Sequence, residues 1–342
     1  MADPTVSAGL ARGLVTVADK RGADEAVLLH RAGIDPAVLT DPDNRVPFAA
    51  YVTLMREAKA MTGDTALALH YAEELDMGQF SVVGLIADAA ETMLHAFAQL
   101  NRYGQLVVEV DGLVDGARFS LEPSAEGLWL IDNRANPNAF PELTESTFAR
   151  MTVGSRQFDD EPFIRAVHVT HPAPPHAAEY DRIFRVPVMF DSTRNAALLD
   201  HRWLTFKLAP APRFAFGILT SHADALLRGL EASKSLRARV ERLILPILHT
   251  GEAGVDRIAG ELGLSRQTLF RRLKTEGATF EKILDDLRRR MALDYLGARK
   301  VSVNETAYLV GFSDPAAFSR AFKRWTGHSP RTLRAARAAK VS

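Results

Sequence analysis

The sequence predicts an α+β N-terminal domain followed by an all-α domain that contains two helix-turn-helix motifs joined by a linker helix. The chain has 342 residues, which is longer than one average domain and favours two. Its charge is divided unequally between an acidic body and a basic C-terminal segment. The basic segment also contains an internal repeat with the pattern of a helix-turn-helix motif. We place the two predicted domains at residues 1–230 and 235–338.

The composition excludes several classes of protein. Apolar residues make up 47% of the chain and charged residues 25%, which is typical of a globular protein with a sizeable core. The chain contains no cysteine, so disulfides, cysteine-ligated metals and thiol nucleophiles are excluded. No charge-free run reaches the roughly 18 residues that a membrane span needs, and the N-terminus lacks the basic region of a signal peptide. We therefore expect a soluble cytoplasmic protein without a membrane partner.

The charge asymmetry indicates a nucleic-acid partner. From Glu252 to Ser342 there are 18 Lys and Arg against 10 Asp and Glu, a net charge of +8. The preceding 251 residues carry 24 against 32, a net charge of −8, so the whole chain is neutral. A basic module beside an acidic body is typical of a nucleic-acid-binding domain joined to a second domain. Charge alone leaves open a solvated basic surface without a partner.

The N-terminal two thirds of the chain combine predicted helices with predicted strands. Helical apolar spacing covers residues 1 to about 104. Later helical patterns lie at residues 142–158 and 177–184. Extended runs lie at residues 105–114, 117–133, 164–172, 186–192 and 195–200. Asp115-Gly116 is expected to form a turn between two strands. Helices first and a mixed sheet later predict an α+β body.

This N-terminal region offers no catalytic motif. It contains no phosphate-binding glycine loop, no G-x-S-x-G and no H-E-x-x-H sequence. His168, His171 and His176 have the spacing H-x2-H-x4-H, but three prolines between the last two oppose convergence on a metal. We interpret these histidines as an ordinary strand-to-loop corner, and residues 159–161 as a solvated acidic turn. The sequence therefore predicts no enzyme, no cofactor and no metal site.

The repeat in the basic segment consists of residues 255–277 and residues 303–327. Ala259 and Ala307 are separated by 48 positions, as are Gly263 and Gly311. Each copy predicts a short helix with a small central residue, a glycine at the turn, and a second helix with buried apolar residues. The alanines let two helices cross closely, and the glycines suit the left-handed backbone that ends a helix. The sequence thus predicts two helix-turn-helix motifs.

Polar residues indicate where the second helix of each motif begins. Ser265 is expected to cap that helix in the first copy. Ser313 or Asp314 is expected to cap the one in the second copy, with Pro315 at its first position. These helices are the candidate reading helices.

Residues 279–296, between the two copies, predict a linker helix. An apolar stripe that includes Leu287 runs along one face, whereas Arg288, Arg289 and Arg290 fall mostly outside it. Such a helix is about 25 Å long, enough to hold two reading helices in successive major-groove segments about 34 Å apart. Residues 235–248 are expected to form the first helix of the same domain. The residues predicted to build its core and turns are Ala259, Gly263, Leu269, Leu273, Leu287, Ala307, Gly311, Phe312, Phe318, Phe322, Gly327 and Pro330.

The last hundred residues resemble the DNA-binding domain of the AraC/XylS transcription regulators. The resemblance covers roughly residues 235–338 and is most specific from residue 310 to residue 330. That stretch contains Gly-Phe before the second reading helix, then F-S-R-x-F-K from Phe318 and G-x-S-P from Gly327. The Tyr-Arg that often follows Ser-Pro in the family is replaced by Leu333-Arg334. The resemblance implies double-stranded DNA at promoters or operators and RNA polymerase as partners.

The N-terminal region is similar to the longer effector domain of one branch of this family, to which ornithine-utilisation and mycobacterial virulence regulators belong. The residues that carry this similarity are Gly63-Asp64, Asn101-Arg102-Tyr103, His171-Pro172, Tyr180, Phe184, Pro187-Val188, Phe190 and Asn195. The similarity implies a regulatory domain that senses a small molecule and often forms a homodimer.

Helix geometry and the resemblance together select the DNA-contacting residues. The predicted base-reading residues are Arg266, Gln267, Phe270 and Arg271 in the first reading helix and Ala316, Ser319 and Arg320 in the second. Arg and Gln recognise guanine and adenine, each with about 1–3 kcal/mol of discrimination. The predicted phosphate contacts, which position the protein without reading sequence, are Arg272, Lys274, Lys323 and Arg324. For any one of these residues a solvated surface role stays open.

Two hypotheses from different classes follow. The first is a sequence-specific DNA-binding transcription regulator that responds to a small metabolite bound by residues 1–230. We expect it to be an activator, located in the cytoplasm and associated with the nucleoid. The second keeps the DNA-binding domain but makes residues 1–230 a dimerisation or protein-interaction module without a ligand. A DNA-tethered enzyme is disfavoured because the chain lacks candidate catalytic residues.

Overall fold

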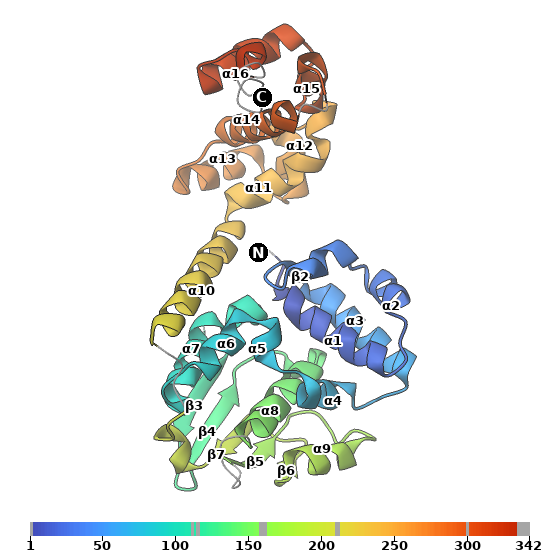
Figure 1. Ribbon diagram of the computed structural model, residues 1–342, viewed down its shortest axis with the longest axis vertical. Coiled ribbons are helices and arrows are strands. Elements are labelled where there is room, and N and C mark those ends of the chain that lie inside the picture. The colour runs from blue at the N-terminus through green and yellow to red at the C-terminus, as the bar shows by residue number, and fades with distance from the viewer. Residues whose placement is uncertain are drawn as a thin grey trace. The chain divides into compact units, whose positions relative to one another are not determined.

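The computed structural model describes residues 3–110, 113, 117–156, 163–208, 213–298 and 301–333. Its contacts divide the chain into two compact units, one from Asp3 to Gly229 and one that begins at Leu230 (Figure 1). Across these described ranges, no helix is long and apolar enough to cross a membrane.

The N-terminal unit begins with a helical subdomain. Its helices are α1 (Ala8–Lys20), α2 (Glu25–Ala32), η1 (Pro36–Thr40), α3 (Phe48–Thr62), α4 (Leu67–Glu74), α5 (Met77–Phe80), α6 (Val82–Asp88) and α7 (Met93–Val107). Strands β1 (Thr5–Ser7) and β2 (Arg45–Pro47) pair antiparallel and interrupt the predicted helical region. Ser7 caps α1 by accepting a hydrogen bond from the backbone N–H of Leu10 at 3.2 Å. Helices α1 to α4 share one apolar core.

A mixed sheet forms the second part of this unit, as the α+β prediction expected. Within the described residues its strands are β3 (Phe119–Pro123), β4 (Leu128–Asp132), β5 (Ile164–His168), β6 (Val188–Met189) and β7 (Ala196–Leu199), in the order β3-β4-β7-β5-β6. The pair β5 and β6 is parallel and the other neighbours are antiparallel. In β4, Leu128 and Leu130 are buried while Trp129 between them is partly exposed, which is the alternation of a strand with one covered face.

Helices and short turns cover and connect the strands of this sheet (Figure 1). They are η3 (Pro137–Ala139), α8 (Glu142–Ser155), α9 (Ala177–Phe184) and η4 (His201–Leu204). Helix α10 (Arg213–Ser233) follows the last strand of the sheet. Phe148 of α8 and Tyr180 and Phe184 of α9 are fully buried and belong to the same core as the sheet. This core, and not a single helix or strand, holds the second part of the unit together.

The strand predicted at residues 105–114 is wrong in its first part, because α7 continues to Val107. Tyr103 and Leu106 lie three positions apart on the buried face of α7, so helical burial outweighs the strand preference of the neighbouring valines. Val108 then forms an isolated bridge with Val6. The predicted turn at residues 115–116 and the predicted acidic turn at residues 159–161 lie outside the described residues.

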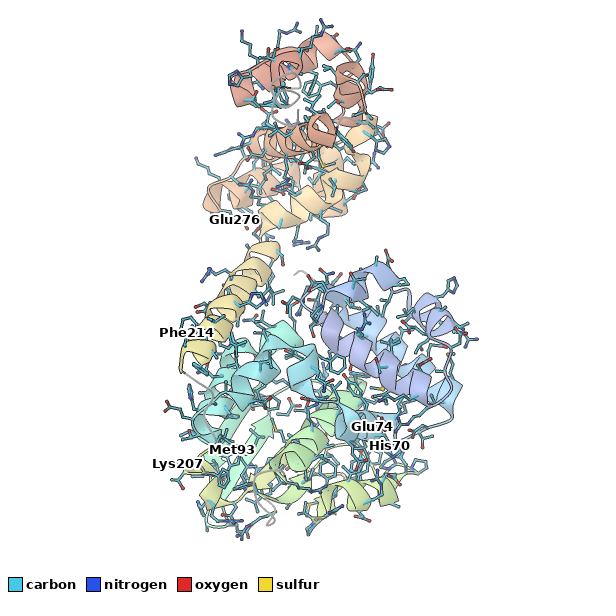
Figure 2. The ribbon with its side chains drawn as sticks, viewed as in Figure 1. His70, Glu74, Met93, Lys207, Phe214 and Glu276 are labelled. Carbon is cyan, nitrogen blue, oxygen red and sulfur yellow. The ribbon has the colours of Figure 1, made fainter. Side chains whose placement is uncertain are left out.

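The unit that begins at Leu230 is helical. Its elements are α11 (Leu236–Ile244), η5 (Leu245–Thr250), α12 (Val255–Glu261), α13 (Arg266–Thr275), α14 (Phe280–Ala298), α15 (Val303–Leu309) and α16 (Pro315–Thr326). The first predicted helix, 235–248, is α-helical only to Ile244, since Pro246 lacks the N–H that would continue it, and a 3₁₀ segment follows. Glu276 accepts hydrogen bonds from the backbone N–H groups of Leu236 and Arg237, at 2.9 and 3.0 Å, and so completes the start of α11 (Figure 2).

Helix α14 contributes to two separate apolar cores in this unit. Ile283 and Leu287 pack in the core that α11, α12 and α13 share. Ala292 and Leu296 pack in the core formed with α15 and α16. Met291 contacts both cores, so one uninterrupted helix connects the two helix-turn-helix motifs.

Candidate functional site

The first reading helix, α13, has the orientation that its apolar spacing predicts. Ser265 caps it by accepting a hydrogen bond from the backbone N–H of Thr268 at 3.2 Å. Leu269 and Leu273 are 0% exposed. The face that remains in solvent therefore carries the predicted base-reading side chains Gln267 and Arg271, both exposed.

Two of the other predicted readers of α13 contact protein as well as solvent. Phe270 is half-buried and packs against the core of the first motif. The guanidinium of Arg266 lies over the Phe270 ring, 5.5 Å from its centroid, and pairs with Asp256 at 3.4 Å. Arg266 is therefore held at the N-terminal end of the helix.

The second reading helix, α16, begins with a cap of the predicted type. The Asp314 carboxylate accepts hydrogen bonds from the backbone N–H groups of Ala316 and Ala317, at 3.0 and 2.9 Å, and Pro315 occupies the first helical position. These two hydrogen bonds hold the pKa of Asp314 below its usual value. Asp314, not Ser313, is therefore the cap, which decides between the two predicted residues.

The outward face of α16 is small and poor in hydrogen-bonding groups. Phe318 and Phe322 are 0% exposed and form the inner face. Ala316 and Arg320 are exposed and Ser319 is half-buried, as their spacing predicts. Arg320 is 4.0 Å from the Asp314 carboxylate with 74% of its side chain exposed, so it is free to reach a base edge.

The predicted phosphate-contacting cations all lie at the surface. Arg272, Lys274 and Lys323 are exposed, and within the described ranges they have no ion pair. Arg324 is exposed too, and pairs with Asp285 of α14 at 3.1 Å. Long, solvated cations of this kind suit phosphate contacts, which need charge at the right place more than a fixed geometry.

Arg288 has a structural role that its position in the sequence did not indicate. Its Nε donates to the carbonyl oxygen of Val310 and its Nη2 to that of Gly311, both at 3.1 Å. The guanidinium also lies over the Phe312 ring, 4.7 Å from its centroid. Burial lowers the pKa of Arg288. In the sequence, this arginine falls mostly outside the apolar stripe of its helix, and no local pattern predicts acceptors that lie 22 and 23 residues further along the chain.

A cavity of about 220 Å³ that is partly open to solvent lies in the N-terminal unit. Its wall is formed by α6, α7 and α8, by three strands of the sheet, and by η4 with the segment that follows it. The lining is largely apolar and includes Met93 (Figure 2), Phe97, Leu100, Leu130, Trp203 and Leu208. Its ionisable residues are Asp88 and Arg150. No local sequence pattern predicts this cavity, because its lining residues come from seven separate segments.

The three histidines considered for a metal do not act as one group. His171 is buried, and its Nε2 lies 3.2 Å from the Tyr180 hydroxyl, which donates to the Glu145 carboxylate at 2.6 Å. Burial raises the pKa of Glu145, and burial together with the charge of Glu145 raises that of Tyr180. The His168 ring is tilted against the Trp129 ring, and His176 stacks on the Tyr180 ring. Among the described residues there is no cluster of three or more potential ligands.

A charged cluster on α4 and α9 connects the two parts of the N-terminal unit. His70 (Figure 2) bridges Asp64 and Glu179, with its ring nitrogens 2.7 and 2.9 Å from their carboxylates. Asp64 pairs in addition with Arg21, and Glu179 with Arg182. Burial alone would lower the pKa of His70, but the hydrogen bonds and charges of the two carboxylates outweigh it and raise the pKa.

The raised pKa of His70 predicts a pH-dependent contribution to stability. Protonated His70 is favoured by folding, so its stabilisation is present below the ordinary histidine pKa of about 6.5 and is lost as pH rises through the higher folded value. His70→Ala should lower the free energy of unfolding by about 1 kcal/mol more at pH 6 than at pH 9. Urea unfolding of the variant and the wild type at both pH values measures this difference in stability loss. His30→Ala, which removes an exposed histidine of α2, is the control, and an equal pH dependence in both variants would contradict the assignment.

Comparison with known proteins matches each of the two units to a protein family. Residues 22–208 match the family described as the arabinose-binding domain of AraC transcription regulators, and residues 258–336 match a helix-turn-helix domain family. The chain is 27% identical to the ornithine utilization regulator of Pseudomonas aeruginosa, over 97% of this chain and 96% of that protein. It is 26% identical to the transcriptional regulator VirS of Mycobacterium tuberculosis, over 92% of each. The crystal structure of the regulator CdpR from Pseudomonas aeruginosa aligns with a TM-score of 0.41 at 21% identity, covering 90% of this chain and 96% of that one.

Proposed function

Since this chain belongs to the AraC family of transcription regulators, we propose that it reads one asymmetric DNA site with two unequal helices and regulates transcription in response to a small metabolite. It is a DNA-binding transcription regulator and not an enzyme. The observation that carries the proposal is geometric: α13 and α16 each bury one face and leave the other in solvent, and α14 joins the two motifs through both of their cores.

Each part of the chain has a role in this proposal. Residues 1–230 form the effector-sensing and dimerisation domain, and residues 235–338 the DNA-binding domain. In α13, Gln267 and Arg271 read bases, with Arg266 and Phe270 beside them. In α16, Arg320 supplies most of the base reading, since Ala316 and Ser319 offer little hydrogen-bonding capacity. The phosphate contacts are Arg272, Lys274, Lys323 and Arg324.

Two variants, Arg271→Ala and Lys323→Ala, test this division between base reading and phosphate contact. Arg271→Ala should weaken specific binding by about 1–3 kcal/mol and relax preference at one or two base pairs, because its bidentate contact is lost. Lys323→Ala should weaken binding to all sequences alike and reduce the salt slope by about one unit. Titrations with a selected site and with random DNA at several salt concentrations measure both effects. Equal losses on the two DNAs for Arg271→Ala would remove it from the base-reading residues.

The apolar cavity of the N-terminal domain favours an effector-binding role for this domain over a ligand-free interaction module. The proposed regulator is an activator that contacts RNA polymerase on the DNA, in the cytoplasm and associated with the nucleoid. Sixteen of the described residues line this space without filling it, which favours a bound ligand over a purely structural role.

We also propose that the chain forms a homodimer through α10. Phe214 (Figure 2) and Ile218 lie four positions apart on this helix, 80% and 54% exposed. Large apolar side chains exposed at helical spacing are typical of an association surface. The sedimentation coefficient of the full-length chain across a concentration series tests this.

A further inference from the structure

We propose that the cavity of the N-terminal unit binds a small uncharged apolar molecule of about nine non-hydrogen atoms. The inference rests on the effector role proposed above and names the chemical class of the effector. Three observations support it. The wall is apolar and in part aromatic, its two ionisable residues are not placed to hold an ionised ligand inside the cavity, and small helical residues leave the space open.

Aromatic and aliphatic side chains form most of the cavity wall. Phe97 of α7 and Trp203 of η4 meet edge to face, with their ring centroids 5.8 Å apart. Phe163, which precedes β5, brings a third ring, and Leu130 and Leu199 contribute aliphatic surface from the sheet. Such a wall gains free energy when it contacts carbon instead of water, and it offers few partners to polar groups. The cavity therefore selects the apolar body of a ligand.

Arg150 lines the cavity, but two of its guanidinium nitrogens are closed to a ligand. Its Nε and Nη2 are inaccessible to solvent. The guanidinium carbon lies 5.6 Å from the centroid of the Tyr71 ring. Tyr71 is 0% exposed, belongs to the core of α1 to α4 and does not line the cavity. The pair of parallel N–H groups that would hold a carboxylate in two hydrogen bonds is therefore not available in the cavity.

Asp88 is the other ionisable residue of the described wall, and it lies where the cavity opens. It is the last residue of α6 and is exposed. An exposed carboxylate keeps much of its hydration, so it gains little from a cation that would have to leave water to reach it. Partial burial, and then the negative charge of Asp76, raise the pKa of Asp88 and so disfavour its charged form. Neither ionisable residue of this wall therefore provides a buried ionic anchor.

Small residues of the surrounding helices leave the space that the ligand fills. Ala87 of α6, Ala96 of α7 and Gly154 of α8 all line the cavity. A Cβ on Gly154 would meet no atom within 4 Å beyond its own stretch of helix. Its backbone is not in the left-handed region that favours glycine. Neither the backbone nor a close neighbour accounts for the missing side chain, so Gly154 leaves this volume to the cavity.

The volume of the cavity sets the size of the ligand. A dry apolar cavity of about 150 Å³ is large enough for benzene. At about 220 Å³ this cavity has room for roughly nine non-hydrogen atoms on the same scale. An aromatic ring with a short side chain, or an eight-carbon chain with one hydroxyl group, matches that volume. Because the cavity is partly open to solvent, such a molecule has a way in.

Binding to the full-length chain is measured by calorimetry at pH 7 with 1-octanol, octanoate and octylamine, three probes that share an eight-carbon chain. The acid and the amine are ionised at this pH. We expect octanol to bind saturably, with one molecule per chain. Octanoate and octylamine should bind at least tenfold more weakly, because each brings a charge to a wall that has no buried partner for it. Equal or tighter binding of octylamine would make Asp88 an anchor, and equal or tighter binding of octanoate would require a cationic one. Either result overturns the inference.

Two variants of Gly154 then test where octanol binds. Gly154→Leu fills the cavity from α8 and should weaken octanol binding at least tenfold. Gly154→Ala adds a single methyl group and should weaken it by a smaller factor. Gly104→Leu is the matched control, because Gly104 is also a helical glycine whose Cβ would meet no atom within 4 Å, but it does not line the cavity. The melting temperature of each unliganded variant reports whether it folds.

The possible outcomes distinguish this inference from the proposed function. Octanol affinity that is unchanged in a folded Gly154→Leu, or reduced equally in Gly104→Leu, overturns the inference. If Gly154→Leu does not fold, unchanged affinity in Gly154→Ala overturns it. Absence of saturable octanol binding to the wild-type chain overturns it as well. Specific DNA binding that survives any of these results leaves the proposed regulator intact. Loss of site preference on DNA in the wild-type chain would instead contradict the proposed function, whatever the cavity binds.

Discussion

Leu287→Pro should abolish specific DNA binding. Leu287 is 2% exposed and lies in the middle of α14, on the side that packs against α11, α12 and α13. Proline removes a backbone donor and clashes with the preceding turn, which costs about 3 kcal/mol or more. Because the second half of α14 packs against α15 and α16, a kink at this position displaces one motif relative to the other. Weak, salt-sensitive binding by whichever motif stays folded should remain.

Footprinting of the variant on a selected site measures this effect. A footprint shortened to one segment, or lost, agrees with a rigid connection. Leu287→Met is the matched control, since a volume-conserving change in a core costs less than about 1.5 kcal/mol and leaves the helix intact. Circular dichroism of both variants reports how much helix each retains. Protection of both segments at near-normal affinity in Leu287→Pro would mean that α14 is a flexible tether.

Gly311→Ala should be much more destabilising than Gly263→Ala, although the two glycines occupy equivalent positions of the repeat. Both have left-handed backbone angles, with φ of 77° and 66°. This conformation alone costs a residue with a Cβ about 1–2 kcal/mol. A Cβ at Gly263 meets no other atom within 4 Å, whereas one at Gly311 overlaps the carbonyl oxygen of Leu248. Overpacking adds about 1–3 kcal/mol, so we expect a loss of roughly 2–5 kcal/mol for Gly311→Ala.

The difference arises because the turn of the second motif is packed against the rest of the unit. The carbonyl oxygens of Val310 and Gly311 accept hydrogen bonds from Arg288, and Leu248 of η5 lies against the same turn. Urea unfolding of the two variants and the wild type measures the losses. Equal losses would show that the left-handed backbone conformation alone determines the loss of stability at both positions. Gly311→Ala should also weaken binding at the segment that α16 reads, while Gly263→Ala retains it.

Local sequence patterns were sufficient for the two helix-turn-helix motifs. Apolar spacing predicted that Leu269, Leu273, Phe318 and Phe322 are buried, and all four are 0% exposed. Ser265 caps its helix as predicted. These features depend on residues within one or two helical turns of each other, so the periodicity and the cap preferences of a single segment determine them.

Local patterns were less reliable in the N-terminal unit. The valine-rich segment after Tyr103 has the composition of a strand, but α7 continues to Val107 because Leu106 is buried on its inner face. The α+β class was nevertheless predicted correctly, since the hairpin of β3 and β4 and the helices α8 and α9 each have a clear period. Element boundaries, by contrast, depended on which residues the rest of the fold buries.

The sequence by itself therefore determined the fold class, the two motifs, the Ser265 cap of the first reading helix and the faces that the reading helices expose, whereas the structure chose Asp314 over Ser313 as the second cap. The tertiary structure alone decided what Arg288 and Gly311 do and which residues line the cavity, because the contacting residues lie far apart along the chain. Arg288 bonds to carbonyl groups 22 and 23 residues away. Gly311 is constrained by a carbonyl oxygen from η5, and Arg150 lines a cavity to which α6, α7, the sheet and η4 contribute. The sequence of side chains does not indicate which backbone carbonyl groups will accept hydrogen bonds or where a cavity will form, because both depend on how distant segments pack.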